Sequence, residues 1–259
     1  MRLSCSVSAC PTLRLPEALT FVKDAGFDGI VLFRDRTEST PVHPDFSVRM
    51  VREHLQAAGV RLAGFNIRNL TGMKADSNER RLDYNLNQLR WDIHLGRALG
   101  LKHANLSGGE RTEENLQDVI EGVNKLLEGL PADFELNLGN CPGNRLKGGA
   151  DFQAVMPHVG PRTKVLLDTG NLLAAGEDVA GFSEAFVDRI GMVHLRDQKG
   201  DQQVPLGEGD LPLEGLLKTL KRAGYRGDLV IALEPVEGQD MLPAVRAARE
   251  RVERVLGQL

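Results

Sequence analysis

The chain has 259 residues, a formal net charge of −4, and an ordinary balance of 41% hydrophobic and 26% charged residues. This composition argues against disorder, and the acidic balance argues against a general affinity for nucleic acid. No run of 18 apolar residues and no secretory leader are apparent, so no membrane partner is predicted. The odd set of three cysteines indicates reduced thiols rather than a disulfide framework. We therefore expect a cytoplasmic protein.

The chain repeats one unit, in which a short apolar run is followed by a helical stretch and a turn that contains glycine. The runs that predict strands are 2–7, 29–33, 61–67, 103–108, 134–138, 164–168, 192–196 and 229–234. Helices are predicted between them, for example at 16–25, 47–58, 78–99, 113–127 and 213–223.

Eight strands that alternate with helices imply parallel pairing and predict a single (β/α)8 TIM barrel domain over residues 1–259. A doubly wound open sheet is the alternative, but no glycine-rich phosphate loop follows the first strand. In a barrel, functional residues come from the carboxyl ends of the strands and from the loops that follow them. The search for a site is therefore restricted to these positions.

The ends of the third, fourth and fifth predicted strands carry neutral polar residues. Asn66 follows the third strand, Asn105 lies in the fourth, and Asn140 follows the fifth. Their amides are suited to binding the hydroxyl groups of a polyol, although turn capping is an equally ordinary role.

The last three strand ends carry Asp168, His194 and Glu234. This mixed oxygen and nitrogen set suits one divalent ion, either Mn²⁺, Mg²⁺, Co²⁺ or Zn²⁺, and leaves positions open for substrate oxygens. Each residue also has a simpler interpretation, as a helix cap, a buried histidine or a solvated charge. Because three adjacent strand ends would each need the simpler interpretation, we favour a metal site.

The C-terminal half resembles the xylose isomerase-like TIM barrels, which include sugar-phosphate isomerases and epimerases, inosose dehydratases and endonuclease IV relatives. The resemblance is carried by "LDTGN", "VHLRDQ", "PLGEGDLPLEGLLKTLKRAGYRGDLVIALEP" and, before the fourth strand, "RALGLKHANLSGG". It implies a metal-dependent isomerase, epimerase or lyase that acts on a small polyol, keto-sugar or cyclitol-like compound. Near the mouth of the barrel, Asn171, Arg196 and Asp197 are further candidates for substrate contacts, and Asp197 could instead orient a metal ligand or form an ordinary surface ion pair.

In the sugar-isomerase branch, four strand-end residues hold one metal ion: Glu, Asp, His and Glu. The first of these positions is Gly139 here, and Asn171 stands where the sixth strand often supplies a histidine. Glycine can neither bind a metal nor transfer a proton, and Glu135 is about 13 Å away along the strand. Glu234 is then expected to act as the sole catalytic base, and a two-base epimerase is doubtful.

The same residues allow alternatives to this enzyme. The barrel could bind a sugar-like ligand without turning it over, or a partner subunit could complete the site, which leaves a homo-oligomer open. An endonuclease IV-like enzyme needs a histidine-rich trinuclear site and a basic face, whereas this acidic chain has six histidines. Trp91, on a predicted helix, is expected in the outer layer or at an oligomer contact.

Overall fold

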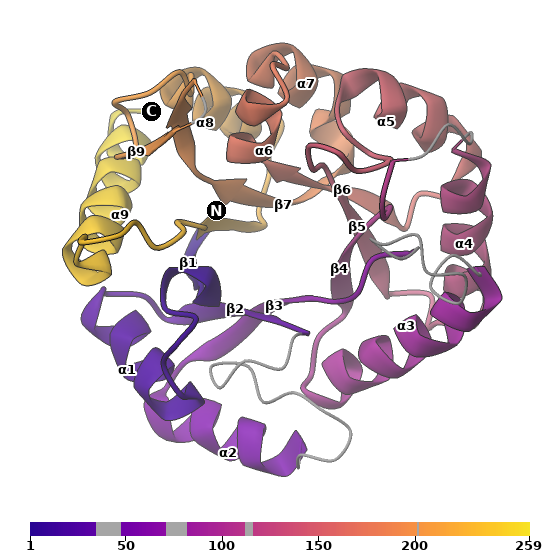
Figure 1. Cartoon of the computed structure of the whole chain (residues 1–259), viewed down its shortest axis with the longest axis horizontal. Coiled ribbons are helices and arrows are strands. Elements are labelled where there is room, and N and C mark those ends of the chain that lie inside the picture. The colour runs from indigo at the N-terminus through magenta and orange to yellow at the C-terminus, as the bar shows by residue number, and fades with distance from the viewer. Residues whose placement is uncertain (35–47, 71–81, 112–115, 201) are drawn as a thin grey trace.

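The computed structural model describes residues 1–34, 48–70, 82–111, 116–200 and 202–259. A ring of parallel strands stands inside a ring of helices (Figure 1), and the sheet closes in the order β1-β10-β7-β6-β5-β4-β3-β2. The barrel strands are β1 Arg2–Ser6, β2 Gly29–Phe33, β3 Arg61–Asn66, β4 His103–Ser107, β5 Glu135–Gly139, β6 Thr163–Asp168, β7 Ile190–Leu195 and β10 Asp228–Ile231. The predicted (β/α)8 barrel is confirmed.

The helices cover the outside of the sheet. They are α1 Leu15–Asp24, α2 Val48–Ala58, α3 Leu82–Ala98, α4 Gln117–Glu128, α5 Gly149–Val155, α6 Thr169–Ala174, α7 Val179–Phe186, α8 Leu213–Arg222 and α9 Met241–Gln258, with short 3-10 turns at Val7–Ala9, Met156–His158 and Val187–Arg189. The predicted starts of three helices, at 47, 78–81 and 113–115, lie outside the described residues. Gly26 and Gly224 follow α1 and α8 with φ of 86° and 74°, the left-handed conformation that commonly ends a helix.

Two details differ from the prediction. The eighth barrel strand ends at Ile231, so Glu234 lies in the loop beyond it. A two-stranded hairpin, β8 Asp197–Lys199 and β9 Gln202–Val204, follows the seventh barrel strand and was not predicted. Gly200, at its turn, has a φ of 58°.

The barrel interior is filled in layers. Its floor is a polar cluster in which the buried Asp228 pairs with Arg61 and accepts a 2.7 Å hydrogen bond from the Ser4 hydroxyl. Above it lies a small apolar cluster that consists of Val31, Ala63, Leu166, Met192 and Val230. These two layers close the lower barrel, as side-chain layers do in this fold.

A chain of asparagine amides adjoins the apolar layer. The Asn137 amide donates to Asn105 Oδ1 at 2.8 Å, and the Asn105 amide donates to Asn66 Oδ1 at 2.8 Å. A Cβ at Gly191 would lie only 2.2 Å from Asn137 Oδ1, so a glycine is needed there. Because buried polar groups are costly without partners, this chain accounts for the buried Asn105 amide, while Asn137 Oδ1 at its end has no hydrogen-bond partner among the described residues.

The outer surface of α3 carries two exposed aromatic side chains. Tyr84 is 51% exposed and Trp91 is 57% exposed. Trp91 therefore lies in the outer layer as predicted, while the oligomer contact stays a prediction.

Within the described residues, no helix has the length and apolar character that a membrane span requires.

Candidate functional site

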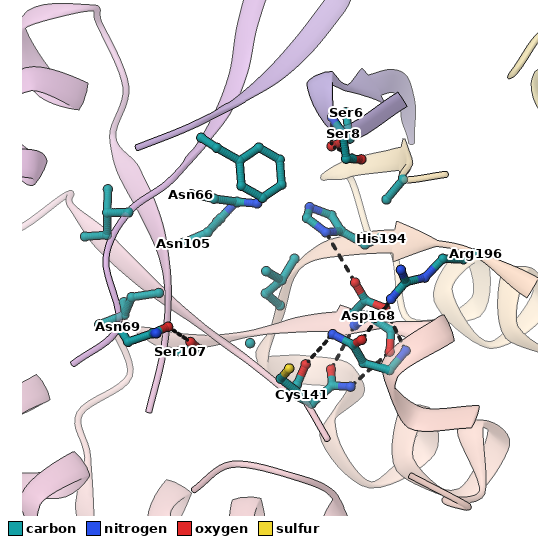
Figure 2. A pocket seen from close by; sticks show the side chains of 18 of the residues that line it. Ser6, Ser8, Asn66, Asn69, Asn105, Ser107, Cys141, Asp168, His194 and Arg196 are labelled. Atoms are coloured by element: carbon teal, nitrogen blue, oxygen red, sulfur yellow. Dashed lines mark hydrogen bonds and ion pairs between the residues drawn. The ribbon is translucent and has the colours of Figure 1, made fainter. Parts of the chain in front are cut away.

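A pocket of about 360 Å³ opens at the carboxyl ends of the barrel strands. Its size falls within the range of small-molecule sites. Figure 2 shows two contrasting walls: Asn66, Asn69, Asn105 and Ser107 on one side, and Asp168, His194 and Arg196 on the other. Its lining also includes Gly139, Asn140, Asn171 and Glu234. The predicted convergence of strand-end residues is thus present in the structure.

Asp168 ends β6 and begins α6, so one carboxylate has two roles. Its Oδ1 accepts a hydrogen bond of 2.9 Å from the backbone N–H of Asn171, as a helix cap does. Its Oδ2 lies 3.6 Å from His194 Nδ1. Burial acts to raise the pKa of Asp168, but the His194 ring and the charge of Arg196 outweigh burial and lower this pKa. Asp168 is therefore a carboxylate that stays charged while it lines the pocket.

Arg196 lies between the two acids of the pocket. Its Nη1 is 2.5 Å from Glu234 Oε1, its Nη2 is 3.5 Å from Asp168 Oδ1, and Nη2 also donates to Asn171 Oδ1 at 2.8 Å. The side chain is only 10% exposed. Burial acts to lower the pKa of Arg196, but the charges of Asp168 and Glu234 raise it overall, so the guanidinium stays positive.

The room for this guanidinium comes from Gly170. A Cβ at Gly170 would lie 2.3 Å from Arg196 Nε, closer than any real Cβ contact. The backbone of Arg196 is fixed as well, because Thr169 Oγ1 accepts from its N–H at 2.9 Å and donates to its carbonyl at 2.7 Å. The segment "DTGN" thus both supplies an acid and shapes the seat of the arginine.

Glu234 stands at the rim, with its side chain 65% exposed. The side-chain amide of Gln203, on β9, holds the Glu234 backbone by accepting from its N–H and donating to its carbonyl, both at 2.9 Å. The sequence did not single out Gln203. The segment "DQKGDQQV" offers Gly200 as a turn residue but no apolar alternation that would predict strands around it.

The predicted substrate-binding amides are already largely hydrogen-bonded within the protein. Asn140 Oδ1 accepts from the Asp168 N–H at 2.8 Å, and Asn140 Nδ2 donates to the Asp168 carbonyl at 2.9 Å. Asn171 Nδ2 donates to the Asn140 carbonyl at 2.9 Å. Asn66 and Asn105 belong to the amide chain inside the barrel. All four line the pocket, and they also hold its walls in place.

Asp197 is the predicted site residue that the structure does not bring to the pocket. It is fully buried, and its carboxylate accepts backbone N–H groups from Gln198, Gly207, Gly209 and Leu211 at 2.8–3.0 Å. Its side chain does not line the pocket and instead organises the "PLGEGD" loop. It has no hydrogen-bonding capacity left for a substrate.

The fifth strand ends at Gly139, which lines the pocket. A Cβ there would meet Leu166 Cδ2 at 3.3 Å, so a side chain needs only a small shift of that leucine. Gly139 thus faces the position where the resemblance implies a glutamate. Next to it, Cys141 also lines the pocket, and burial raises the pKa of its thiol.

The residues present do not fit a divalent ion in this arrangement. The fifth-strand ligand is missing, Glu234 is held by Arg196, and the guanidinium supplies a positive charge between the two carboxylates. Across the described part of the chain, no group of three His, Cys, Asp or Glu side chains is placed to hold a metal. Among the residues that the structure describes, His194 Nε2 has no hydrogen-bond partner, and it is buried.

Three further residues of the site, Ser6, Ser8 and Asn69, were not predicted to bind substrate, and all three line the pocket. Ser6 ends the first strand and Ser8 follows it, while Asn69 bonds to Ser107, which the sequence does offer as a hydroxyl binder at the end of the fourth strand. Ser8 also donates to the Leu233 carbonyl at 3.0 Å, which ties the first strand to the Glu234 loop. The same strand-end reasoning that found Asn66 would have found the two serines.

Comparisons with known proteins agree with this architecture. A putative L-ribulose-5-phosphate 3-epimerase of Escherichia coli K12 is 26% identical over 267 residues, covering 93% of this chain and 91% of the relative. A putative hydroxypyruvate isomerase of Streptomyces coelicolor is 28% identical over 284 residues, covering 96% and 97%. The expectation of an enzyme of sugar isomerase or epimerase type is confirmed at this level.

Among solved structures, the IolI protein with a zinc atom has a TM-score of 0.81 at 15% identity, covering 100% of this chain and 99% of that one. A D-allulose 3-epimerase from Methylomonas sp. in complex with D-allulose has a TM-score of 0.79 at 17% identity, covering 98% and 96%. At these identities the structures show a shared fold. Residues 19–255 match the sequence profile of the xylose isomerase-like TIM barrels, and the chain belongs to that family.

Proposed function

We propose that the pocket isomerises a small keto-sugar or related hydroxy-carbonyl compound, with Glu234 as the base. The observation that carries this proposal is the pairing of a wall of amides and hydroxyls with a wall that holds Asp168, His194, Arg196 and Glu234. The first wall suits the hydroxyl groups of a sugar, and the second supplies a base and groups that stabilise negative charge.

The chemistry is a proton shift between neighbouring carbons. The Glu234 carboxylate removes a proton from the carbon beside the carbonyl, and the electron pair of that C–H bond moves to give an enediolate. The protonated Glu234 then delivers the proton to the former carbonyl carbon, while a hydroxyl proton moves between the two oxygens. Arg196 is the cation beside this base, at 2.5 Å from its carboxylate, and would stabilise the charge on the enediolate oxygen.

The lining favours isomerisation over epimerisation. Inversion at one carbon needs one group on each face of the enediolate, whereas a shift between two carbons can use one base on one face. Gly139 removes the carboxylate expected opposite Glu234. The nearby thiol of Cys141 has a raised pKa, so it is protonated near neutral pH and is a poor base. Asp168 is engaged by Asn171 and Arg196.

Proton exchange in D2O tests this proposal. We would follow a panel of three- to six-carbon ketoses, inososes, hydroxypyruvate and the phosphorylated sugars by NMR. The expected result is an aldose–ketose or equivalent product with deuterium at the carbons beside the carbonyl. Glu234→Gln should abolish the exchange, whereas Glu237→Gln, at an exposed neighbouring position, should leave it unchanged.

Two results would contradict the proposal. Inverted configuration with deuterium at a single carbon would identify an epimerase. Binding without any isomerised product and without any exchange would identify the non-catalytic alternative. Binding can be followed at Cys141, because Cys5 and Cys10 are buried while Cys141 is partly exposed in the pocket. A bound sugar should slow the labelling of this thiol by a small maleimide.

A further inference from the structure

The positive charge of the pocket is supplied by the protein itself. The Arg196 guanidinium is directed at both acids, with Nη1 at 2.5 Å from Glu234 and Nη2 at 3.5 Å from Asp168. The Arg196 side chain is 10% exposed, which is close to the exposure of the Asp168 side chain that ends the sixth strand. A surface arginine with alternative rotamers would not have this geometry.

The surroundings of Arg196 leave room for it and pair its terminal nitrogens, while its Nε is buried without a hydrogen-bond partner among the described residues. Gly170 leaves the space that its Nε occupies, and Thr169 fixes its backbone through two hydrogen bonds. Asn171 accepts from Nη2 at 2.8 Å. At this position the resemblance implies a histidine, and a histidine would offer no carbonyl oxygen to the guanidinium. Three consecutive residues after Asp168 therefore favour an arginine at this place.

The charge balance points the same way. Two carboxylates and one guanidinium leave a single net negative charge around the position where a metal ion would sit. A divalent ion at that position would be attracted by only one net negative charge, and the nearby guanidinium would repel it. The third carboxylate that would outweigh this repulsion is missing, because its position is Gly139.

We propose that Arg196 replaces the divalent ion of this site, so that the protein binds and turns over its substrate without a metal. The part that concerns turnover rests on the isomerisation proposed above. Nη1 has two N–H groups and one of them faces Glu234, which leaves the other for a substrate oxygen. Arg196 is then the catalytic electrophile.

Metal titration tests the replacement without reference to activity. The full chain, treated with a chelator and dialysed, is titrated with Mn²⁺ and with Zn²⁺ and followed by elemental analysis. We expect the wild-type protein to hold well below one ion per chain. Arg196→Met combined with Gly139→Glu should bind one ion per chain, roughly tenfold or more tighter than wild type, because the repelling charge is lost and a carboxylate is gained.

Matched variants separate the two changes. Gly139→Ala with Arg196→Met adds a side chain without a carboxylate and should bind more weakly than the glutamate version. Arg111→Met removes a guanidinium that pairs with Asp151 at 2.7 Å outside the pocket, and it should leave the titration unchanged. If Arg196→Met does not fold, Gly170→Ala displaces the guanidinium by contact while keeping its charge.

The outcomes distinguish this inference from the proposed function. One tightly bound ion per chain in the wild type, lost in His194→Ala, would overturn the replacement. Proton exchange in metal-free protein that a chelator does not reduce would support it, and exchange that requires an added ion would overturn it while leaving the isomerisation intact. If no sugar exchanges under either condition, the proposed function fails and the titration alone decides the role of Arg196.

Discussion

Replacing Asp197 by asparagine tests how the loop after the seventh barrel strand is held. Oδ1 of this buried carboxylate accepts from the N–H groups of Gln198 and Leu211, both at 2.9 Å. Oδ2 accepts from Gly207 at 2.8 Å and from Gly209 at 3.0 Å. An asparagine keeps one acceptor oxygen, but it turns an NH2 donor toward two N–H donors. Half of the network is therefore lost in a change of almost no volume.

The expected cost follows from these contacts. A hydrogen bond to a charged acceptor contributes about 1.5–3 kcal/mol, so two lost bonds correspond to about 3–6 kcal/mol. Water at the exposed Gly207 would place the value toward the lower end. For a chain of this size, 1 kcal/mol corresponds to roughly 2–4 °C in Tm, so Asp197→Asn should melt at least about 6 °C below wild type.

The assay is urea and thermal unfolding followed by circular dichroism. Asp210→Asn is the matched control, since it makes the same chemical change at an exposed position of the same loop. The control should stay within about 0.5 kcal/mol of wild type. If Asp197→Asn is as stable as wild type, the four backbone contacts of Asp197 do not hold the loop.

Two further predictions concern stability away from the pocket. Asp92→Ala should lower the free energy of unfolding by about 3–5 kcal/mol, because it leaves Arg34, whose side chain is 4% exposed and 2.8 Å from Asp92, as an unpaired buried charge. Asp83→Ala, at an 85% exposed site on the same helix, should change it little in the same urea titration. Burial lowers the pKa of His103 in the folded protein. As the pH falls below about 6.5, the unfolded state therefore binds more protons than the folded state does. The free energy of unfolding should be highest above that pH and should decrease below it. In a plot of the urea midpoint against pH, His103→Gln should reduce the slope below about pH 6.5. An unchanged slope would show that His103 is not the group responsible.

The barrel could be predicted because its signals are local. Apolar runs of strand length recur between helical stretches, and glycines such as Gly26 and Gly224 end helices with a conformation that glycine favours. The strand ends then identified Asp168, His194 and Gly139 as neighbours. The hairpin escaped prediction because each of its strands has three residues and no apolar face, so its pattern is too short to separate from a loop.

The direction of Arg196 could not be predicted from sequence. A long side chain after a strand end can point to solvent or into the barrel. Here the inward direction of Arg196 is set by Gly170 and Asn171, which lie 26 and 25 residues earlier in the chain. The role of Asp197 was hidden for the same reason, since its partners lie up to 14 residues further along the chain. Both outcomes depend on contacts between separate loops, which periodicity does not encode.

Neutral side-chain amides hold the backbones of the two acids of the pocket. Asn140 bonds to both backbone groups of Asp168, and Gln203 bonds to both backbone groups of Glu234, so each amide continues the hydrogen-bonding of the sheet beyond the last paired residue. Because these contacts involve no carboxylate oxygen, the Glu234 carboxylate keeps Arg196 and the pocket as its partners. A base held in this way can change its protonation state without disturbing the backbone that carries it, which is the property that a proton shuttle between two carbons requires.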